Sequence, residues 1–168
     1  VDVYLQTAPG VMQAPAQYAI AVDPWGLSAE DFDGDGRLDL VAATPSTVPP
    51  EVGVINDSGG VSMLRQDPAN PGRFLASAWT RTGGAAQAAA IAQLTGDAFA
   101  DVVVADAILV NARALLLAQN SAQLGTLLPP ATLSIGGGRG ATDVAIGDIN
   151  NDGLVDVALA ATDSVAVF

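Results

Sequence analysis

Short apolar runs separated by polar turns are the dominant pattern along the chain. The runs consist mainly of Val, Ala, Leu and Ile, and they lack the 3.6-residue spacing of an amphipathic helix. Representative runs are LDLVAA at 38–43, VVVADA at 102–107 and VDVALAA at 155–161. The Ala-rich stretch 84–92 is expected to be a strand too, because its counterparts elsewhere in the chain have strand character. The pattern predicts an all-β protein.

Three sequence elements recur along the chain: an acidic turn, the small or apolar run that leads into it, and a second short apolar run ending in glutamine. The copies of the turn are DFDGDGRLDLVAA at 31–43, QLTGDAFADVVVA at 93–105 and DINNDGLVDVALA at 148–160. The run ending in glutamine occurs as VDVYLQ at 1–6, VSMLRQ at 61–66 and ALLLAQ at 114–119, with VAVF at 165–168 as a further copy. Gln6, Gln66 and Gln119 align at the end of this element. The chain is therefore interpreted as a repeat protein.

Each repeat is predicted to hold four short strands, with one strand entering the acidic turn, one leaving it and two more following. The chain forms one repeat region, 1–168, with units at approximately 1–60, 61–113 and 114–168. Four-stranded antiparallel units repeated at this period are typical of β-propeller blades. Propellers usually have four to eight blades, so about three blades predict part of a larger propeller or an assembly of copies.

One segment of the first unit has the composition of a surface loop. The insertion at 44–60 is rich in Pro, Gly and Ser, which are residues of turns and loops. Within it, NDSG at 56–59 is a candidate contact loop.

Composition and charge exclude several classes of function. The net charge is −12, from 18 acidic residues and 6 arginines, so no basic surface for nucleic acid or an anionic membrane is expected. Charged residues interrupt the most apolar region, 85–118, which is therefore not a membrane span. The absence of Cys and His removes disulfides, thiolate sites and imidazole bases. The glycine-rich GGGRG at 136–140 lacks the Lys-Ser/Thr of a phosphate loop and is interpreted as a strand connection.

The acidic turn has the ligand pattern of a site for a hard cation. Four aspartates within nine positions repel one another, so something must offset their charge. Side chains at positions one, three, five and nine, counted from the first residue of each turn, and the carbonyl at position seven are expected to point inward. Calcium accepts six to eight oxygen ligands at flexible geometry, whereas magnesium requires a stricter octahedron. A solvated acidic turn is the alternative, and two intact copies in register favour the metal.

The turn differs from an EF-hand. Gly36 stands at position six, as in an EF-hand, but position twelve is Ala42 in the first copy and Leu159 in the third. An EF-hand requires a bidentate Glu there and helices on both sides.

The two intact turns resemble the calcium loop of FG-GAP/VCBS-type repeats, which are the blades of integrin-α-like β-propellers. The following VSMLRQDPANPGRF is also similar to that repeat, and the resemblance covers nearly the whole chain. It implies a calcium ion in the hairpin loop between the first two strands of a blade. The implied ligands of the first loop are Asp31, Asp33, Asp35, Asp39 and the Arg37 carbonyl. Those of the third loop are Asp148, Asn150, Asp152, Asp156 and the Leu154 carbonyl.

The middle loop departs from the family pattern. Gln93 and Thr95 replace acids, and Ala98 replaces a glycine. Thr95, Asp97 and Asp101 remain as its candidate ligands.

The remaining acidic and aromatic residues are scattered. Asp106 and Asp163 are interpreted as turn residues rather than a catalytic pair, and enzymatic activity is not expected. The few aromatic residues are expected to pack between blades, with exposed sugar-binding rings as the alternative; they include Tyr4, Tyr18, Trp25, Phe74 and Trp79.

These features predict a non-catalytic, calcium-stabilised scaffold for adhesion or assembly. Calcium stabilises such a fold wherever the ion is abundant, which favours secretion or display at the cell surface. The expected partner is a protein or glycan surface ligand, which the resemblance does not identify. Two alternatives stay open, namely a subunit of a surface filament assembled by strand pairing between terminal strands, and an accessory propeller of a secreted polysaccharide-active enzyme.

Overall fold

The computed structural model describes residues 1–20, 23–45, 59–97, 99–108, 111–134 and 140–168. These residues form strands β1 to β15 and, among the residues listed, no helix. The all-β prediction is confirmed, and the Ala-rich stretch is strand β9. Most of the insertion, at 46–58, and the glycine-rich segment 136–139 lie outside the described residues.

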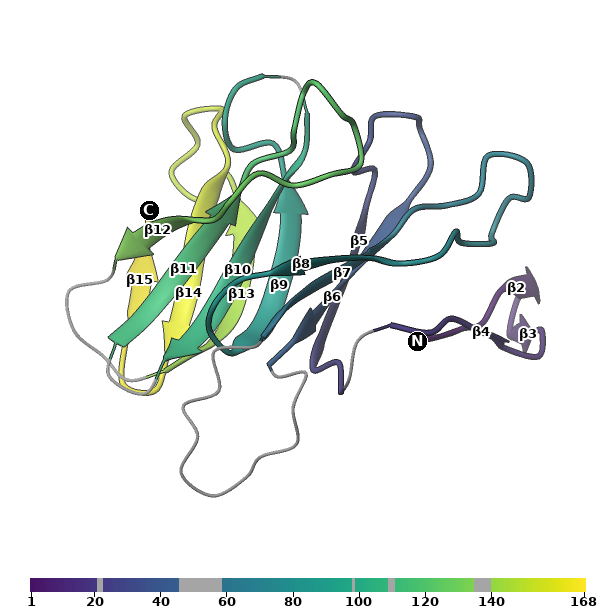
Figure 1. Cartoon of the computed structure of the whole chain (residues 1–168), viewed down its shortest axis with the longest axis horizontal. Helices are drawn as coiled ribbons and strands as arrows, with labels where there is room; N and C mark the ends of the chain where they lie inside the picture. Colours follow the sequence, from purple (N-terminus) through teal and green to yellow (C-terminus); the bar gives the residue numbers. More distant parts are fainter. Residues whose placement is uncertain (21–22, 46–58, 98, 109–110, 135–139) are drawn as a thin grey trace.

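Three antiparallel sheets follow one another along the chain and lie side by side in Figure 1. The first sheet has the order β5 (Gly26–Glu30), β6 (Asp39–Thr44), β7 (Gly60–Leu64) and β8 (Ala78–Arg81). The second sheet consists of β9 (Ala86–Ala92), β10 (Asp101–Ile108), β11 (Asn111–Leu117) and β12 (Ala131–Ser134). The third sheet consists of β13 (Ala141–Gly147), β14 (Asp156–Ala161) and β15 (Val165–Val167). Each sheet is a meander, because its neighbouring strands are consecutive in sequence.

The N-terminal segment forms two short strand pairs at one end of the molecule (Figure 1). These are β1 (Asp2–Val3) with β4 (Ala16–Gln17), and β2 (Gln6–Ala8) with β3 (Val11–Met12). The ring of Tyr18 packs edge-on against that of Phe74, with centroids 5.4 Å apart, and so ties this segment to the first sheet. The expectation that the aromatic residues pack between blades is wrong for Tyr4, Trp25 and Trp79, which are 55%, 68% and 38% exposed.

The sheets show where each repeat begins in space. The boundaries expected near residues 60 and 113 fall inside β7 and β11. A repeating sequence does not show at which residue the structural unit begins. In the structure, hydrogen bonds join β5 through β8 in one sheet and β9 through β12 in the next.

The core lies between the sheets, with the second sheet as the middle layer. On β10, Val102 and Val104 belong to the cluster shared with the first sheet, while Val103 and Ala105 belong to the cluster shared with the third. Successive side chains of a strand point to opposite faces, so a strand covered on both faces is a continuous apolar run. This explains the VVVA segment at 102–105 of β10.

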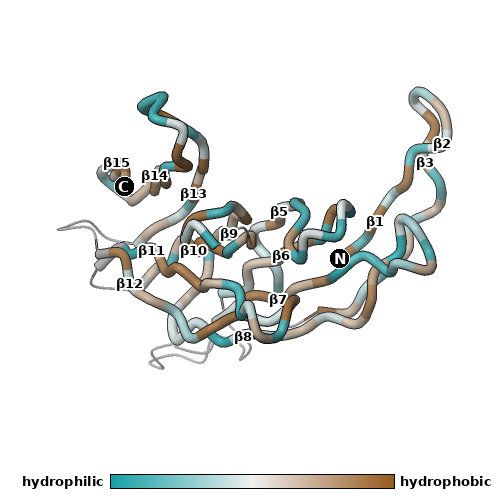
Figure 2. Tube along the Cα trace, turned by 90° about the horizontal axis from the view of Figure 1, so that it is seen from above, coloured by the Kyte–Doolittle hydropathy of each residue, from teal (hydrophilic) through white to brown (hydrophobic). Residues whose placement is uncertain are grey.

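The three acidic turns are hairpin loops of identical register. The pairs that close them are Glu30 with Asp39, Ala92 with Asp101 and Gly147 with Asp156. Consequently, the ninth residue of every turn begins the second strand of its sheet. All three loops lie on the same side of the molecule (Figure 1), the side that Figure 2 views from above.

Candidate metal centre

The first acidic loop is shaped by two glycines and by the carboxylate of Asp31. Gly34 and Gly36 have φ angles of 75° and 83°, in the left-handed region that glycine adopts at no steric cost. The Asp31 carboxylate accepts hydrogen bonds from the N–H groups of Gly34 at 2.9 Å, Asp35 at 3.1 Å and Gly36 at 2.9 Å. The loop therefore wraps around its first residue.

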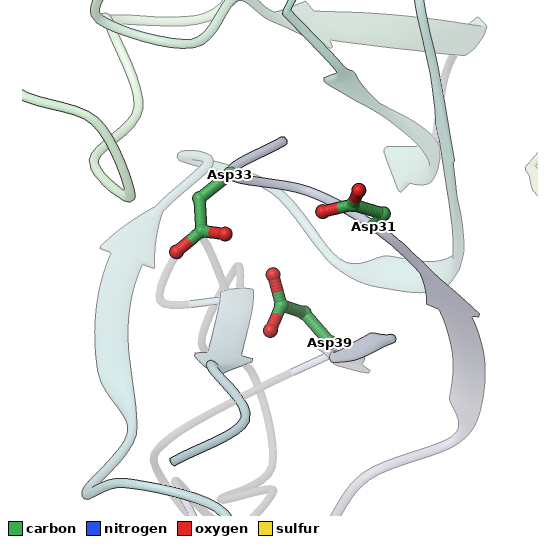
Figure 3. A group of neighbouring side chains, drawn as sticks. All are labelled: Asp31, Asp33 and Asp39. Atoms are coloured by element: carbon green, nitrogen blue, oxygen red, sulfur yellow. The ribbon is translucent and has the colours of Figure 1, made fainter. Parts of the chain in front are cut away.

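Three carboxylates of this loop converge on one point. One carboxylate oxygen from each of Asp31, Asp33 and Asp39 lies within 4.8 Å of the other two, and the side chains point toward one another (Figure 3). Asp39 is fully buried, and burial, followed by the nearby Asp33 carboxylate, raises its pKa. The buried Oδ1 of Asp33 has no hydrogen-bond partner. A hard cation would fit these residues, because it takes oxygen ligands and would offset the repulsion.

Asp39 also fixes the backbone around the loop. Its Oδ2 accepts a hydrogen bond from the N–H of Phe32 at 3.2 Å, and its Oδ1 accepts one from the N–H of Gln66 at 2.7 Å. The first bond closes the loop, and the second attaches the loop to the chain that follows β7. The carboxylate at position nine is thus a structural cap as well as a candidate ligand.

Asp35, a further predicted ligand of the first loop, is not part of this group. Asp35 forms an ion pair with the Arg37 guanidinium and accepts a hydrogen bond from the Arg37 N–H at 2.9 Å. Nη1 of Arg65 lies 3.5 Å from Oδ2 of Asp33. In this structure two arginines therefore neutralise part of the charge of the loop.

The third loop repeats the backbone geometry of the first. Asp148 accepts hydrogen bonds from the N–H groups of Asp152 at 3.0 Å and Gly153 at 2.9 Å. Asp156 accepts them from Ile149 at 2.8 Å and Asn150 at 3.3 Å.

Two of its predicted ligands, Asn150 and Asp152, contact each other. Nδ2 of Asn150 donates to Oδ2 of Asp152 at 2.9 Å, and the N–H of Leu154 donates to Oδ1 of Asp152 at 2.8 Å. Among the described residues, the group in the first loop is the one set of three acids within mutual reach of a single ion.

The middle loop retains the cap at position nine. Asp101 is fully buried and accepts hydrogen bonds from the N–H groups of Leu94 at 3.0 Å, Thr95 at 2.9 Å and Gln119 at 2.9 Å. Asp97 accepts a hydrogen bond from Phe99 N–H at 3.1 Å. Thr95 is thus held here through its backbone, and Ala98 lies outside the described residues.

The recurring glutamine supports the acidic loops, a role that was not predicted from the sequence. The Nε2 groups of Gln66 and Gln119 each donate to the carbonyl at position eight of the loop in their own sheet, Leu38 and Ala100, at 2.9 Å. Their alignment in the repeat was the signal that pointed to a shared role.

The interpretation of Asp106 as a turn residue is wrong. Asp106 lies within β10, fully buried, and its Oδ2 accepts a hydrogen bond from Nε of Arg113 at 2.6 Å. Its Oδ1 is buried without a partner.

Fold and loops together define an all-β repeat protein with acid-capped hairpins. The family model of the FG-GAP repeat matches residues 24–62, which span the first acidic loop and strands β5 and β6. The expected FG-GAP repeat is therefore confirmed over residues 24–62. FG-GAP repeats occur in extracellular adhesion and propeller domains, and they often bind calcium. No curated protein matches the chain. The described residues include no helix that could span a membrane.

Proposed function

We propose that the chain is a non-catalytic, calcium-stabilised scaffold built from propeller blades, acting in adhesion or assembly outside the cell. The observation that carries this proposal is the convergence of Asp31, Asp33 and Asp39 in the segment that matches the FG-GAP repeat. The side-by-side antiparallel sheets support the propeller reading, with each sheet as one blade.

Calcium is the ion that this chain suits best. The candidate ligands are carboxylate, amide and carbonyl oxygens, and the chain contains neither His nor Cys. In the first loop, Asp31, Asp33 and Asp39 would hold the ion, and Asp35 would join them after leaving Arg37. The third loop would use Asp148, Asn150, Asp152, Asp156 and the Leu154 carbonyl. The bound ion supplies positive charge and rigid cross-links to the hairpin.

A structural role for the ion is supported by what the most buried acids do. Asp39 and Asp101, two of the fully buried acids, accept hydrogen bonds from backbone N–H groups that shape their hairpins. A general acid or base must instead reach a proton of a substrate. A calcium-dependent fold is stable where the ion is plentiful, which supports secretion or surface display and a protein or glycan ligand.

A pair of thermal melts tests the proposal. Excess calcium is expected to raise the unfolding midpoint relative to EDTA, and magnesium is expected to do so much less, because binding to the folded state alone stabilises it by mass action. The matched variant Asp31→Asn/Asp33→Asn should lose the part of the calcium-dependent shift that the first loop contributes. Identical melts of the parent chain in calcium and in EDTA would refute the calcium role.

Assembly by strand pairing is a second candidate. The third sheet contains three described strands where the first and second contain four, and β15 is its edge. A further strand on β15, from another copy or from additional chain, would complete a four-stranded sheet. Sedimentation of the purified chain over a range of concentrations tests this candidate, since self-pairing increases the mass with concentration.

A further inference from the structure

Gln119 lies between the first and second sheets with 2% of its surface exposed. It follows β11, and its backbone N–H donates to Oδ1 of Asp101 at 2.9 Å. Its Oε1 accepts a hydrogen bond from the N–H of Gly125 at 3.2 Å. The backbone N–H and the side-chain oxygen of Gln119 are thus both bound within the second sheet and its turn.

The amide nitrogen of Gln119 reaches into the first sheet. Nε2 donates to the carbonyl of Phe32 at 2.6 Å, across 87 positions of sequence, and to the carbonyl of Ala100 at 2.9 Å. An amide group has two N–H donors, and both are used here. Because the site is buried, losing these donors would leave two carbonyls without partners.

Phe32 is the residue between two candidate ligands of the acidic loop. Its N–H is bound by Asp39, its ring is fully buried in the cluster shared with the second sheet, and its carbonyl is bound by Gln119. The backbone that directs Asp31 and Asp33 is therefore held from both sheets.

Gln66 is the counterpart of Gln119 in the first sheet, and comparing the two shows which contact only Gln119 makes. Its Nε2 binds the carbonyl of Leu38 at 2.9 Å and its Oε1 accepts from Gly72 at 3.1 Å, just as Gln119 binds Ala100 and Gly125. The described hydrogen bonds of Gln66 all lie within the first sheet, so the bond to Phe32 distinguishes Gln119.

We propose that Gln119 is a positioning residue for the ion site of the first loop, so that calcium binding in one sheet is coupled to the packing of the next. This inference rests on the proposed calcium function. By linkage, a contact that strengthens calcium binding is itself strengthened by calcium to the same extent. Partners one shell beyond a metal ligand typically change affinity about 10–100-fold when removed.

The test is calcium titration by calorimetry in an Asp148→Ala background, which isolates the first loop. Gln119→Met keeps the length of the side chain and removes its donors, and it is expected to weaken binding at least about ten-fold. Gln123→Met is the matched control in the same turn, because its side chain is exposed, and it should leave the affinity unchanged. The third loop, isolated by Asp31→Ala/Asp33→Ala, should not respond to Gln119→Met.

The outcomes separate the two proposals. Unchanged affinity in Gln119→Met, or equal losses in both loops, would overturn the positioning role while the calcium function stands. A parent chain that binds no calcium in its first loop would overturn both.

A reciprocal measurement decides the matter if Gln119→Met does not fold. Hydrogen exchange of the Asp148→Ala protein should show that calcium slows exchange at the N–H groups of Gln119 and Gly125. Slowing confined to the first sheet would overturn the coupling.

Discussion

The backbone N–H of Gln66 donates a hydrogen bond of 2.7 Å to the carboxylate of Asp39, across 27 positions of sequence. The corresponding pair in the second sheet is Gln119 and Asp101, at 2.9 Å. In both sheets, the aspartate at position nine lies at the start of the second strand. Its carboxylate binds the chain that follows the third strand. The cap needs no ion, so these aspartates contribute to folding even in a loop without metal.

Removing the cap is expected to destabilise the protein without calcium. Asp39→Ala leaves the N–H groups of Phe32 and Gln66 without their acceptor, and each unpaired buried group costs about 1–3 kcal/mol. Urea unfolding in EDTA measures this loss. Asp163→Ala is the control, because Asp163 is an exposed turn residue and its removal should change the free energy of unfolding by less than about 0.5 kcal/mol. Equal stability of the two variants would contradict the capping role.

The ionisation of Asp39 is expected to depend on calcium. Burial and the neighbouring Asp33 carboxylate raise the pKa of Asp39 above its ordinary value of 3.8. The folded chain then takes up this proton at a higher pH than the unfolded chain. In EDTA, the stability that Asp39 contributes therefore falls as pH rises through its raised pKa.

A carboxyl NMR titration tests this expectation. The midpoint for Asp39 should lie above 3.8 in EDTA and should move down when calcium is added, because a cation favours the carboxylate. A midpoint at or below 3.8 in EDTA would show that hydrogen bonding outweighs burial.

The middle loop should gain calcium when its missing ligands are restored. Gln93→Asp/Thr95→Asp/Ala98→Gly recreates the pattern of the first loop, and Gly96 already has a left-handed φ of 77°. Calorimetry should show one more calcium per chain than in the parent. A variant with Gln93→Asn/Thr95→Ser/Ala98→Gly controls for the backbone change. An unchanged stoichiometry would mean that the ligand pattern alone does not create a site.

The buried pair of Asp106 and Arg113 offers a test of electrostatics away from the loops. Arg113→Met would strand the Asp106 carboxylate in the core, and breaking a buried pair typically costs about 3–5 kcal/mol. The double variant Asp106→Ala/Arg113→Met removes the charge as well and should recover part of this loss. Urea unfolding of both variants provides the comparison, and a double variant less stable than Arg113→Met would show that packing by Asp106 dominates.

Two glycines of similar conformation should differ in their tolerance to alanine. Gly125 and Gly83 have φ angles of 81° and 75°. A Cβ at Gly125 would lie 2.8 Å from Cδ of Arg65, whereas nothing lies within 4 Å of one at Gly83. Gly83→Ala should cost about 1–2 kcal/mol through its left-handed backbone alone, and Gly125→Ala should cost more. Thermal unfolding of the two variants measures the difference, and equal losses would show that Arg65 moves aside freely.

The sequence was sufficient for features encoded in local, repeated patterns. Alternation and the acidic turns predicted the all-β class, and the fully buried Asp39 could be named because it stands in a nine-residue motif. The hydrogen bond from Gln119 to the carbonyl of Phe32 could not be predicted from the sequence, because it joins residues 87 positions apart through a backbone atom. The burial of Asp106 was missed for the same reason, since it depends on how neighbouring strands and sheets pack.

The cap at position nine survives in the middle loop, although Gln93 and Thr95 there have replaced acids. Asp101 still gathers three backbone N–H groups, as the geometry of that hairpin requires. Within this short motif, the residue that stabilises the turn and the residues that would bind an ion can therefore change independently. A duplicated repeat can lose its ion ligands one substitution at a time while its hairpin keeps its shape, and the same separation would let an engineer add or erase ion sites in a chosen repeat.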